Sequence, residues 1–402
     1  MLLGALVFSG CVNTAEMAAA RDAAAAKVAR QAKERTLGLQ AFQDGDLELA
    51  RPYLENSLKA NSPDPEVQYH LALLHQAEGR TDKALSMVRG LVGDVDEEGF
   101  VSAFRLYTAL SISLGRLDEA EDLLKDFTEE DPSNLTRLNL LHRIYLEQGK
   151  HAAVMREARG VLKKDETNVG AMHNLASAYL ATNRPEQAKY IIQRAVSLDE
   201  SNGSSHVLSA QIYAALGSET KQLESLEKAH ALVPRNGEIQ NALAVQYLRV
   251  GDHESALALL QVAVRSTPAF VDARINLGNA LRGMKEYQAA ASAYEESLKL
   301  NPRAADAHYN LGILFLQSDV YGQGELERYK RALSEFEMFR DQVGPATSTD
   351  VDGMIQETQG LIKLAVERRE EALKAAEEAE EEDETEEFNE EDLEDGDSEF
   401  EE

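Results

Sequence analysis

The chain has 402 residues, 43% of them hydrophobic, and a formal net charge of −30 at pH 7. Phosphate backbones repel so acidic a protein, and we therefore expect no binding of nucleic acid. A single cysteine excludes an internal disulfide bond, and the nine histidines show no metal-ligand spacing. Because phosphate-binding loops and nucleophile motifs are also missing from the sequence, we expect neither an enzyme nor a bound cofactor or metal.

An apolar run of ten residues, MLLGALVFSG, stands directly before Cys11. A run of this length is too short to span a bilayer. The run and its cysteine resemble a bacterial lipoprotein signal, in which residues 1–10 are a signal peptide and Cys11 carries the lipid. The resemblance implies a lipid anchor on the periplasmic face of the outer membrane. The alternative is an ordinary first helix with a buried cysteine, in a cytoplasmic protein.

Residues 11–30 are rich in alanine with scattered Lys and Arg. This composition predicts a helix that has little apolar surface to bury. It would serve either as a lipidated tether that lifts the rest of the chain from the membrane or as a cap on the structure that follows.

From residue 31 to 346 the sequence repeats a pair of short amphipathic helices at a step of 34 residues, with two extra residues near Gly99 and Phe100. Most copies place a glycine where the first helix ends, and Asn183 and Lys285 replace it in two. One position of the second helix is nearly always small: Ala50, Ala84, Ala120, Val154, Ala188, Gln222, Ala256, Ala290 and Ala332. The predicted hairpins span residues 31–64, 65–98, 101–134, 135–168, 169–202, 203–236, 237–270, 271–304 and 305–346.

This pattern resembles the tetratricopeptide repeat. The resemblance implies an all-α fold, a right-handed superhelical solenoid of about nine helix-turn-helix hairpins, whose first helices line a groove. The sixth repeat position holds Asn174, Asn276 and Asn310, which resemble the asparagine ladder that binds a peptide backbone in O-linked N-acetylglucosamine transferase. An amide both donates and accepts hydrogen bonds, as an extended peptide requires. The alternative is that asparagine is simply frequent at this position.

The end of the chain departs from the repeat. About eight extra residues precede Ala332, from length variation or as part of a binding site. We predict a capping helix over residues 354–376. Residues 377–402 contain eighteen acidic residues and no Lys or Arg, which predicts a disordered tail. Its Phe388, Leu393 and Phe400 would anchor on a basic partner, unless the tail only solvates the protein.

These features together predict a non-enzymatic, lipid-anchored scaffold that binds protein partners, either an extended peptide or the subunits of a bacterial envelope complex. Gliding motility, type IV pili and secretion are the envelope machines that use similar repeat lipoproteins. One alternative is an accessory regulator of a cell-wall enzyme. Another is a cytosolic adaptor, if Cys11 is not lipidated.

Overall fold

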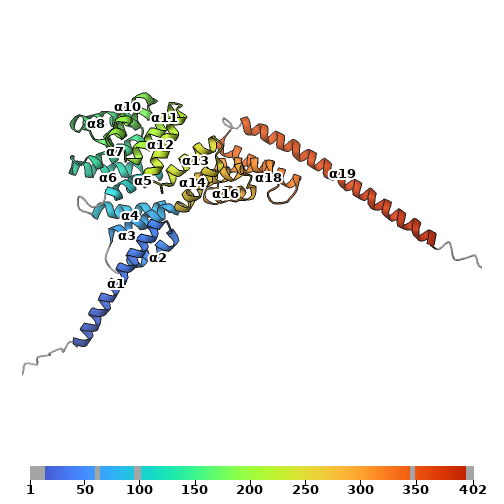
Figure 1. Cartoon of the computed structure of the whole chain (residues 1–402), viewed down its shortest axis with the longest axis horizontal. Helices are drawn as coiled ribbons and strands as arrows, with labels where there is room; N and C mark the ends of the chain where they lie inside the picture. Colours follow the sequence, from blue (N-terminus) through green and yellow to red (C-terminus); the bar gives the residue numbers. More distant parts are fainter. Residues whose placement is uncertain (1–13, 59–63, 95–100, 345–348, 395–402) are drawn as a thin grey trace, which may run out of the picture. The chain divides into compact units, whose positions relative to one another are not determined.

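The computed structural model describes residues 14–58, 64–94, 101–344 and 349–394, and over these ranges it contains helices and no strands (Figure 1). Nine hairpins and one further helix, α19 (Thr349–Glu394), account for the nineteen helices that it shows. The first helices are α1 (Thr14–Asp44), α3 (Pro65–Ala77), α5 (Val101–Ser113), α7 (Leu135–Glu147), α9 (Val169–Ala181), α11 (Gly203–Ala215), α13 (Gly237–Arg249), α15 (Val271–Gly283) and α17 (Ala305–Gln317). The second helices are α2 (Leu47–Leu58), α4 (Thr81–Asp94), α6 (Leu117–Glu130), α8 (His151–Lys164), α10 (Pro185–Leu198), α12 (Glu219–Leu232), α14 (His253–Ser266), α16 (Tyr287–Leu300) and α18 (Glu325–Val343). The predicted all-α fold of nine hairpins is confirmed.

The chain forms two compact units. Unit 1 comprises Met1–Gln246 and Gln261–Phe270, and unit 2 comprises Tyr247–Leu260 and Val271–Glu402. The division passes through α13 and α14, so the seventh hairpin contributes to both units.

The turn inside each hairpin depends on one residue in the left-handed conformation. Gly149 has φ of 73°, and its N–H donates to the carbonyl of Leu146, while the N–H of Lys150 donates to that of Tyr145. These bonds satisfy carbonyls that the end of α7 leaves without a helical partner. Asn183 and Lys285 adopt the same conformation, with φ of 56° and 65°, which confirms their predicted role as substitutes for glycine.

Short polar segments begin several of the first helices. The carboxylate of Asp131 accepts hydrogen bonds from the N–H and the hydroxyl of Ser133, and these bonds lower the pKa of Asp131. The side-chain oxygen of Asn134 then accepts from the N–H of Arg137 and caps the start of α7. The same arrangement recurs before α9 and α11, at Asp165 to Asn168 and at Asp199 to Asn202.

Within a hairpin, a residue of the first helix faces a core residue of the second, and their sizes are complementary. Gly278 of α15 faces Tyr294 of α16, and a Cβ atom at position 278 would overlap the tyrosine ring. Gly312 of α17 faces the ring of Phe336 in the same way. Other hairpins hold alanine at the first position and a smaller core residue sixteen positions later, as in Ala176 and Ile192 or Ala244 and Leu260.

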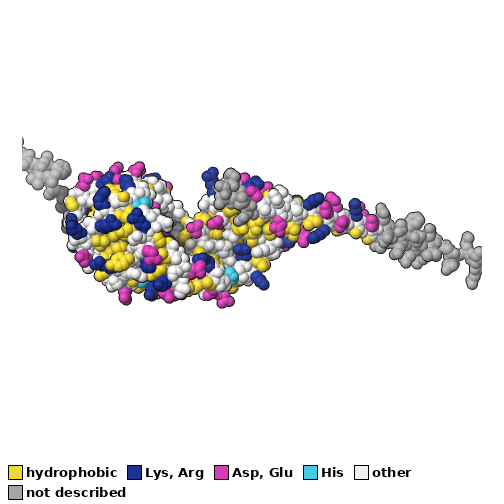
Figure 2. Space-filling view, turned by 90° about the horizontal axis from the view of Figure 1, so that it is seen from above, with side chains coloured by type: hydrophobic (Ala, Val, Ile, Leu, Met, Phe, Trp, Pro, Cys, Tyr) yellow, Lys and Arg dark blue, Asp and Glu magenta, His cyan; other side chains and the backbone are white. Residues whose placement is uncertain are grey.

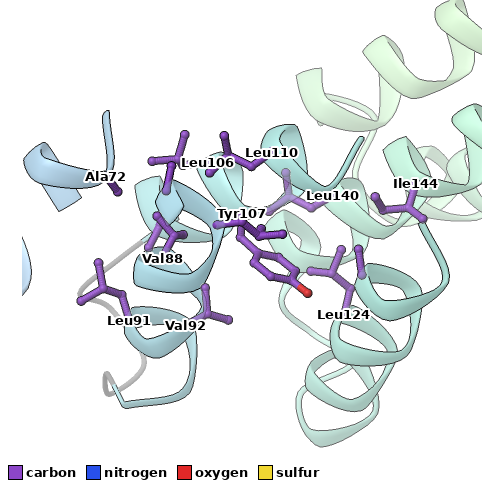
Figure 3. Packing of buried hydrophobic residues seen from close by; sticks show 14 of the residues in the cluster. Ala72, Val88, Leu91, Val92, Leu106, Tyr107, Leu110, Leu124, Leu140 and Ile144 are labelled. Atoms are coloured by element: carbon purple, nitrogen blue, oxygen red, sulfur yellow. The ribbon is translucent and has the colours of Figure 1, made fainter. Parts of the chain in front are cut away.

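Neighbouring hairpins bury a continuous core between them. Figure 3 shows one such region of unit 1, where Tyr107 of α5, only 1% exposed, points among side chains from the helices on either side. The labelled neighbours come from α3 to α7: Ala72, Val88, Leu91, Val92, Leu106, Leu110, Leu124, Leu140 and Ile144. A hairpin alone would expose these apolar faces, so the array is stable only as a stack.

The N-terminal segment differs from the predicted division at residue 30. α1 is one helix from Thr14 to Asp44, so the alanine-rich segment continues without a break into the first hairpin. Alanine has the highest helix propensity and nothing at the boundary stops the helix. Residues 21–30 are exposed, and Arg35, further along, donates to Asp64 at 2.8 Å. Cys11 and the predicted signal peptide, residues 1–10, lie outside the described residues.

The insertion in the last hairpin lengthens both its turn and its second helix. Residues 318–324 form the turn, which Asp319 closes by accepting hydrogen bonds from the N–H groups of Gln323 and Gly324. α18 has nineteen residues, against fourteen in α16.

α19 caps unit 2, as predicted, but it is much longer than the predicted helix of residues 354–376. Val351, Ile355, Thr358 and Ala365 are buried, and the helix contacts α18. Residues 367–379 are exposed, and α19 continues to Glu394. The helix of residues 377–394 agrees with the high helix propensity of alanine and glutamate, and the disorder predicted for residues 377–402 stays a prediction. Residues 395–402 lie outside the described residues.

The fit between Gly278 and Tyr294 predicts a size-dependent loss of stability. Gly278→Ala is expected to lower the free energy of unfolding by about 1–3 kcal/mol, because the new methyl group overpacks a buried ring. The double variant Gly278→Ala with Tyr294→Leu should lose less stability than the sum of the two single losses, because other hairpins hold alanine and leucine at these two positions. Urea unfolding followed by circular dichroism measures these values.

Gly360→Ala in α19 is the matched control. A Cβ atom there meets nothing within 4 Å, so this change should stabilise unit 2 by about 0.5–1 kcal/mol through helix propensity alone. Equal effects at positions 278 and 360 would contradict the packing argument.

Candidate functional site

The first helices of unit 1 stack against each other, and α5, α7, α9 and α11 are in contact in chain order. At one place unit 1 also contacts a part of itself that is distant in sequence. The N–H of Ala269 donates to the carbonyl of Ala77 at the end of α3, over 3.1 Å. A Cβ atom at Gly79 would lie 3.0 Å from the methyl group of Ala269, so the two turns are in close contact. We call this contact the closure of unit 1.

The closure borders a partly open hollow of about 940 Å³, which we call the closure cavity. One side consists of the ends of α1 and α3 with their turns, and the other consists of the turns that precede and follow the seventh hairpin. Its lining includes apolar side chains and amides: Phe42, Gln43, Leu47, His70, Leu73, Gln76, Ala77, Ala269 and Phe270. A cavity of this size, with apolar walls and a few polar groups, is typical of a ligand site.

Aromatic side chains determine the chemistry of one wall. The rings of Phe42 and His70 meet edge to face with centroids 5.0 Å apart, and Tyr69 contacts the other side of His70 at 5.5 Å. Nδ1 of His70 lies 2.7 Å from the carbonyl oxygen of Glu66 and must donate to it. In the neutral ring Nε2 is then a hydrogen-bond acceptor, suited to an N–H or O–H group of a ligand.

The charges in the lining cancel. Arg235 and Glu238 lie beside the start of α13 and contribute one charge of each sign, while Gln43 and Gln76 contribute neutral amides. The cavity thus has no net charge within a strongly acidic protein. A neutral ligand with an apolar group and amide groups, such as a peptide segment, fits it best.

The predicted asparagines lie on three first helices, one in unit 1 and two in unit 2. Asn174 lies on α9 in unit 1, whereas Asn276 and Asn310 lie on α15 and α17 in unit 2. Asn174 is only 4% exposed, and its amide donates to the backbone and side-chain oxygens of Asn139 at 3.1 and 3.2 Å. This amide connects α7 to α9. The side-chain oxygen of Asn276 accepts from Asn279 at 3.3 Å. Asn310 is half-buried, and the role of the three residues in peptide binding stays a prediction.

Sequence reasoning missed the closure cavity, although one signal pointed to it. The turns between most hairpins end in polar pairs, such as Ser133-Asn134, Ser201-Asn202 and Arg235-Asn236. The turn after the seventh hairpin instead ends in Ala269-Phe270. Apolar residues in a turn that would otherwise face solvent indicate a contact with another part of the protein. Here that part is the second hairpin.

Burial lowers the pKa of several histidines on the first helices, and His173 is an example. His173 of α9 packs toward α11, with Nε2 2.7 Å from the hydroxyl oxygen of Ser205. Desolvation by burial, and secondarily the charge of Arg143, lowers its pKa to about 4. The imidazole is therefore neutral at pH 7, and it serves as a contact between hairpins.

None of the described helices is long and apolar enough to span a bilayer. In the same residues, no three His, Cys, Asp or Glu side chains are placed to hold a metal ion.

Comparisons with known proteins identify the repeat. Models of the tetratricopeptide repeat match residues 41–98 and 145–212, 241–293 and 278–319, which together cover about half of the chain. No curated protein sequence gives a significant match.

Several solved structures have a similar fold. A chain of the APC/C hetero-tetramer Cut9–Hcn1 aligns with a TM-score of 0.55 and 16% identity, over 77% of this chain and 59% of its own length. The chain thus spans well under two thirds of that protein, and the likeness shows the fold alone. PilW, a type IV pilus biogenesis factor, aligns at 0.43 and 21% identity over 50% of this chain and 90% of its own. YrrB, described as having an unusual peptide-binding site, aligns at 0.40 and 21% identity over 44% and 91%.

The lowered pKa of His173 predicts a loss of stability in acid. Below the unfolded pKa of about 6.5, the unfolded chain binds a proton that the folded protein excludes down to about pH 4. Stability should therefore fall as the pH decreases from about 6.5 to 4. His173 should account for about 3 kcal/mol of this fall, since one pKa unit corresponds to about 1.4 kcal/mol, and His173→Gln should remove that part. Urea unfolding at pH 7.5, 5.5 and 4.5 measures the difference, and identical pH dependences of the two proteins would contradict the assignment.

Proposed function

Because the chain belongs to the tetratricopeptide-repeat family, we propose that it is a non-catalytic adaptor that binds a peptide segment of a protein partner in the closure cavity of unit 1. The closure itself carries this proposal. It borders a partly open hollow whose lining has an aromatic wall, amides and no net charge.

The chemistry of the cavity favours a neutral peptide. An apolar side chain of the ligand would pack between Phe42 and Phe270, and full burial of such a side chain contributes about 1.5–3 kcal/mol. The N–H groups of the ligand backbone would find acceptors at Nε2 of His70 and at the amides of Gln43 and Gln76. A strongly charged peptide would gain nothing here, because Arg235 and Glu238 balance each other.

We further propose that the protein acts at the bacterial cell envelope, attached to the outer membrane through lipid on Cys11. The sequence MLLGALVFSG before Cys11 supports this proposal. The part of α1 from Thr14 to Arg30 would then act as a spacer, because its residues extend over about 25 Å as a helix. The partner would be a component of a motility, pilus or secretion complex. Regulation of a cell-wall enzyme is the second candidate, and a cytosolic adaptor remains if Cys11 carries no lipid.

Site-specific photocrosslinking tests the binding site. A photoreactive amino acid at Gln76, which is exposed and lines the cavity, should capture a partner in cells that make the protein. The same group at Lys228, exposed on α12, is the control and should not capture it. Phe270→Ser should reduce the yield about tenfold, through the loss of about 1.4 kcal/mol of apolar contact. Capture from Lys228 with none from Gln76 would place the binding surface elsewhere.

Comparison of the wild type with Cys11→Ser tests the anchor. The wild type should carry acyl mass and sediment with the outer membrane, whereas the variant should be unmodified and remain in the supernatant. Intact mass spectrometry and membrane fractionation give the two readouts. A wild type that is soluble and unmodified would refute the lipid anchor and leave the cytosolic adaptor.

A further inference from the structure

A second groove of unit 1 lies between α8 and α10, away from the closure cavity. It is a small hollow of about 290 Å³. We call it the basic groove, and its lining consists of Arg159, Leu162, Lys163, Glu166, Met172, Tyr190, Ile191 and Arg194. Three cations and one carboxylate thus surround four apolar or aromatic side chains.

This chemistry is unusual for the chain. Residues 151–198 contain seven Lys and Arg and four Asp and Glu, in a protein whose net charge is −30. Figure 2, viewed from above Figure 1, shows Lys and Arg side chains interspersed with hydrophobic ones over the part of unit 1 to which α8 and α10 belong. A local positive region of this kind attracts acidic ligands.

The groups in the basic groove are accessible. Tyr190 is 70% exposed, which is unusual for a large aromatic side chain. The ion pair between Arg194 and Glu166 has a distance of 3.4 Å with both partners exposed, so it stabilises the protein little. Lys163 is exposed, and a ligand carboxylate can reach it without breaking a buried contact.

The same chain contains a segment of complementary chemistry. Residues 377–402 carry eighteen acidic residues and no Lys or Arg, and Phe388, Leu393 and Phe400 are spaced among them. We propose that the basic groove of one copy binds the acidic tail, residues 377–402, of a second copy. An aromatic side chain of the tail would pack on Tyr190 and the apolar floor, while neighbouring carboxylates pair with Lys163 and Arg194.

α19 favours a second copy as the source of the tail. Ala365 is the last residue of α19 buried against unit 2, and the helix extends about 44 Å beyond it to Glu394. The remaining residues, 395–402, span at most about 28 Å even when fully extended. α19 therefore carries residues 377–394 beyond the part of the helix that packs on unit 2, where a second molecule can reach them.

Each contact is weak, but two can act together. Exposed ion pairs contribute about 0.2–1 kcal/mol each, and one aromatic side chain adds about 1.5–3 kcal/mol. In a symmetric pair each copy donates a tail and receives one, so the second contact forms within the complex. Electrostatic attraction also makes the association sensitive to salt, because the Debye length falls from about 10 Å at 0.1 M to about 3 Å at 1 M.

Analytical ultracentrifugation of the full chain tests the proposal, independently of any partner in the closure cavity. The wild type should associate reversibly at low salt, and NaCl at 0.5 M should weaken this association. A chain that ends after Ala376 keeps the residues of α19 that are buried up to Ala365, and its dissociation constant should rise at least about tenfold. Lys163→Glu with Arg194→Glu should have the same effect. Arg21→Glu with Lys27→Glu, which changes the net charge equally on the exposed part of α1, should leave association unchanged.

A labelled peptide of residues 377–402 distinguishes the occupants. It should bind the chain that ends after Ala376 and fail to bind the double variant at positions 163 and 194. A monomeric wild type at all concentrations, or a tail that binds its own chain independently of concentration, would overturn the proposal. Binding of vesicles containing anionic phospholipid through Lys163 and Arg194, without binding of the peptide, would assign the groove to a membrane surface and also overturn it.

Discussion

The whole structure depends on the close crossing of two helices within each hairpin. At this crossing the second helix holds a side chain that is fully buried in nearly every repeat, as at Ala50, Ala188 and Ala290. The first helix holds a residue whose size is complementary to that of the neighbouring core residue, and Gly278, for example, leaves space for the ring of Tyr294. Because interiors are close-packed, a change in one partner requires a change in the other. Gln222 departs from the small-residue rule, and it is only half-buried.

The stacking of hairpins gives the protein long-range organisation from short-range contacts. Each hairpin contacts its neighbours, and among the described residues the closure joins segments about 190 residues apart, Ala77 and Ala269. That contact borders a partly open hollow that has an aromatic wall and no net charge, in an acidic protein. The helices provide a rigid frame, while the binding groups at the cavity come largely from their ends and turns.

Charge is distributed unevenly along the chain, and this unevenness has structural consequences. The acidic tail extends from a helix that leaves unit 2 after Ala365. The region around Lys163 and Arg194 carries the opposite charge, beside the exposed ring of Tyr190. Complementary charges on two segments of the chain favour contacts between them, and salt modulates such contacts.

The sequence by itself determined the hairpins, because their signals are local. A period of 34 residues, a small residue at each crossing, and Gly149 or Asn183 at the turns are all readable from neighbouring positions. It placed the capping helix at residues 354–376, whereas α19 spans Thr349–Glu394, since helix propensity alone extends this helix. Only the tertiary structure decided that Asn174 holds two helices together and that Phe270 lines a cavity with Phe42. Both roles depend on which distant segments of the chain come into contact. The successive packing of the hairpins determines that contact, and no local sequence motif encodes it.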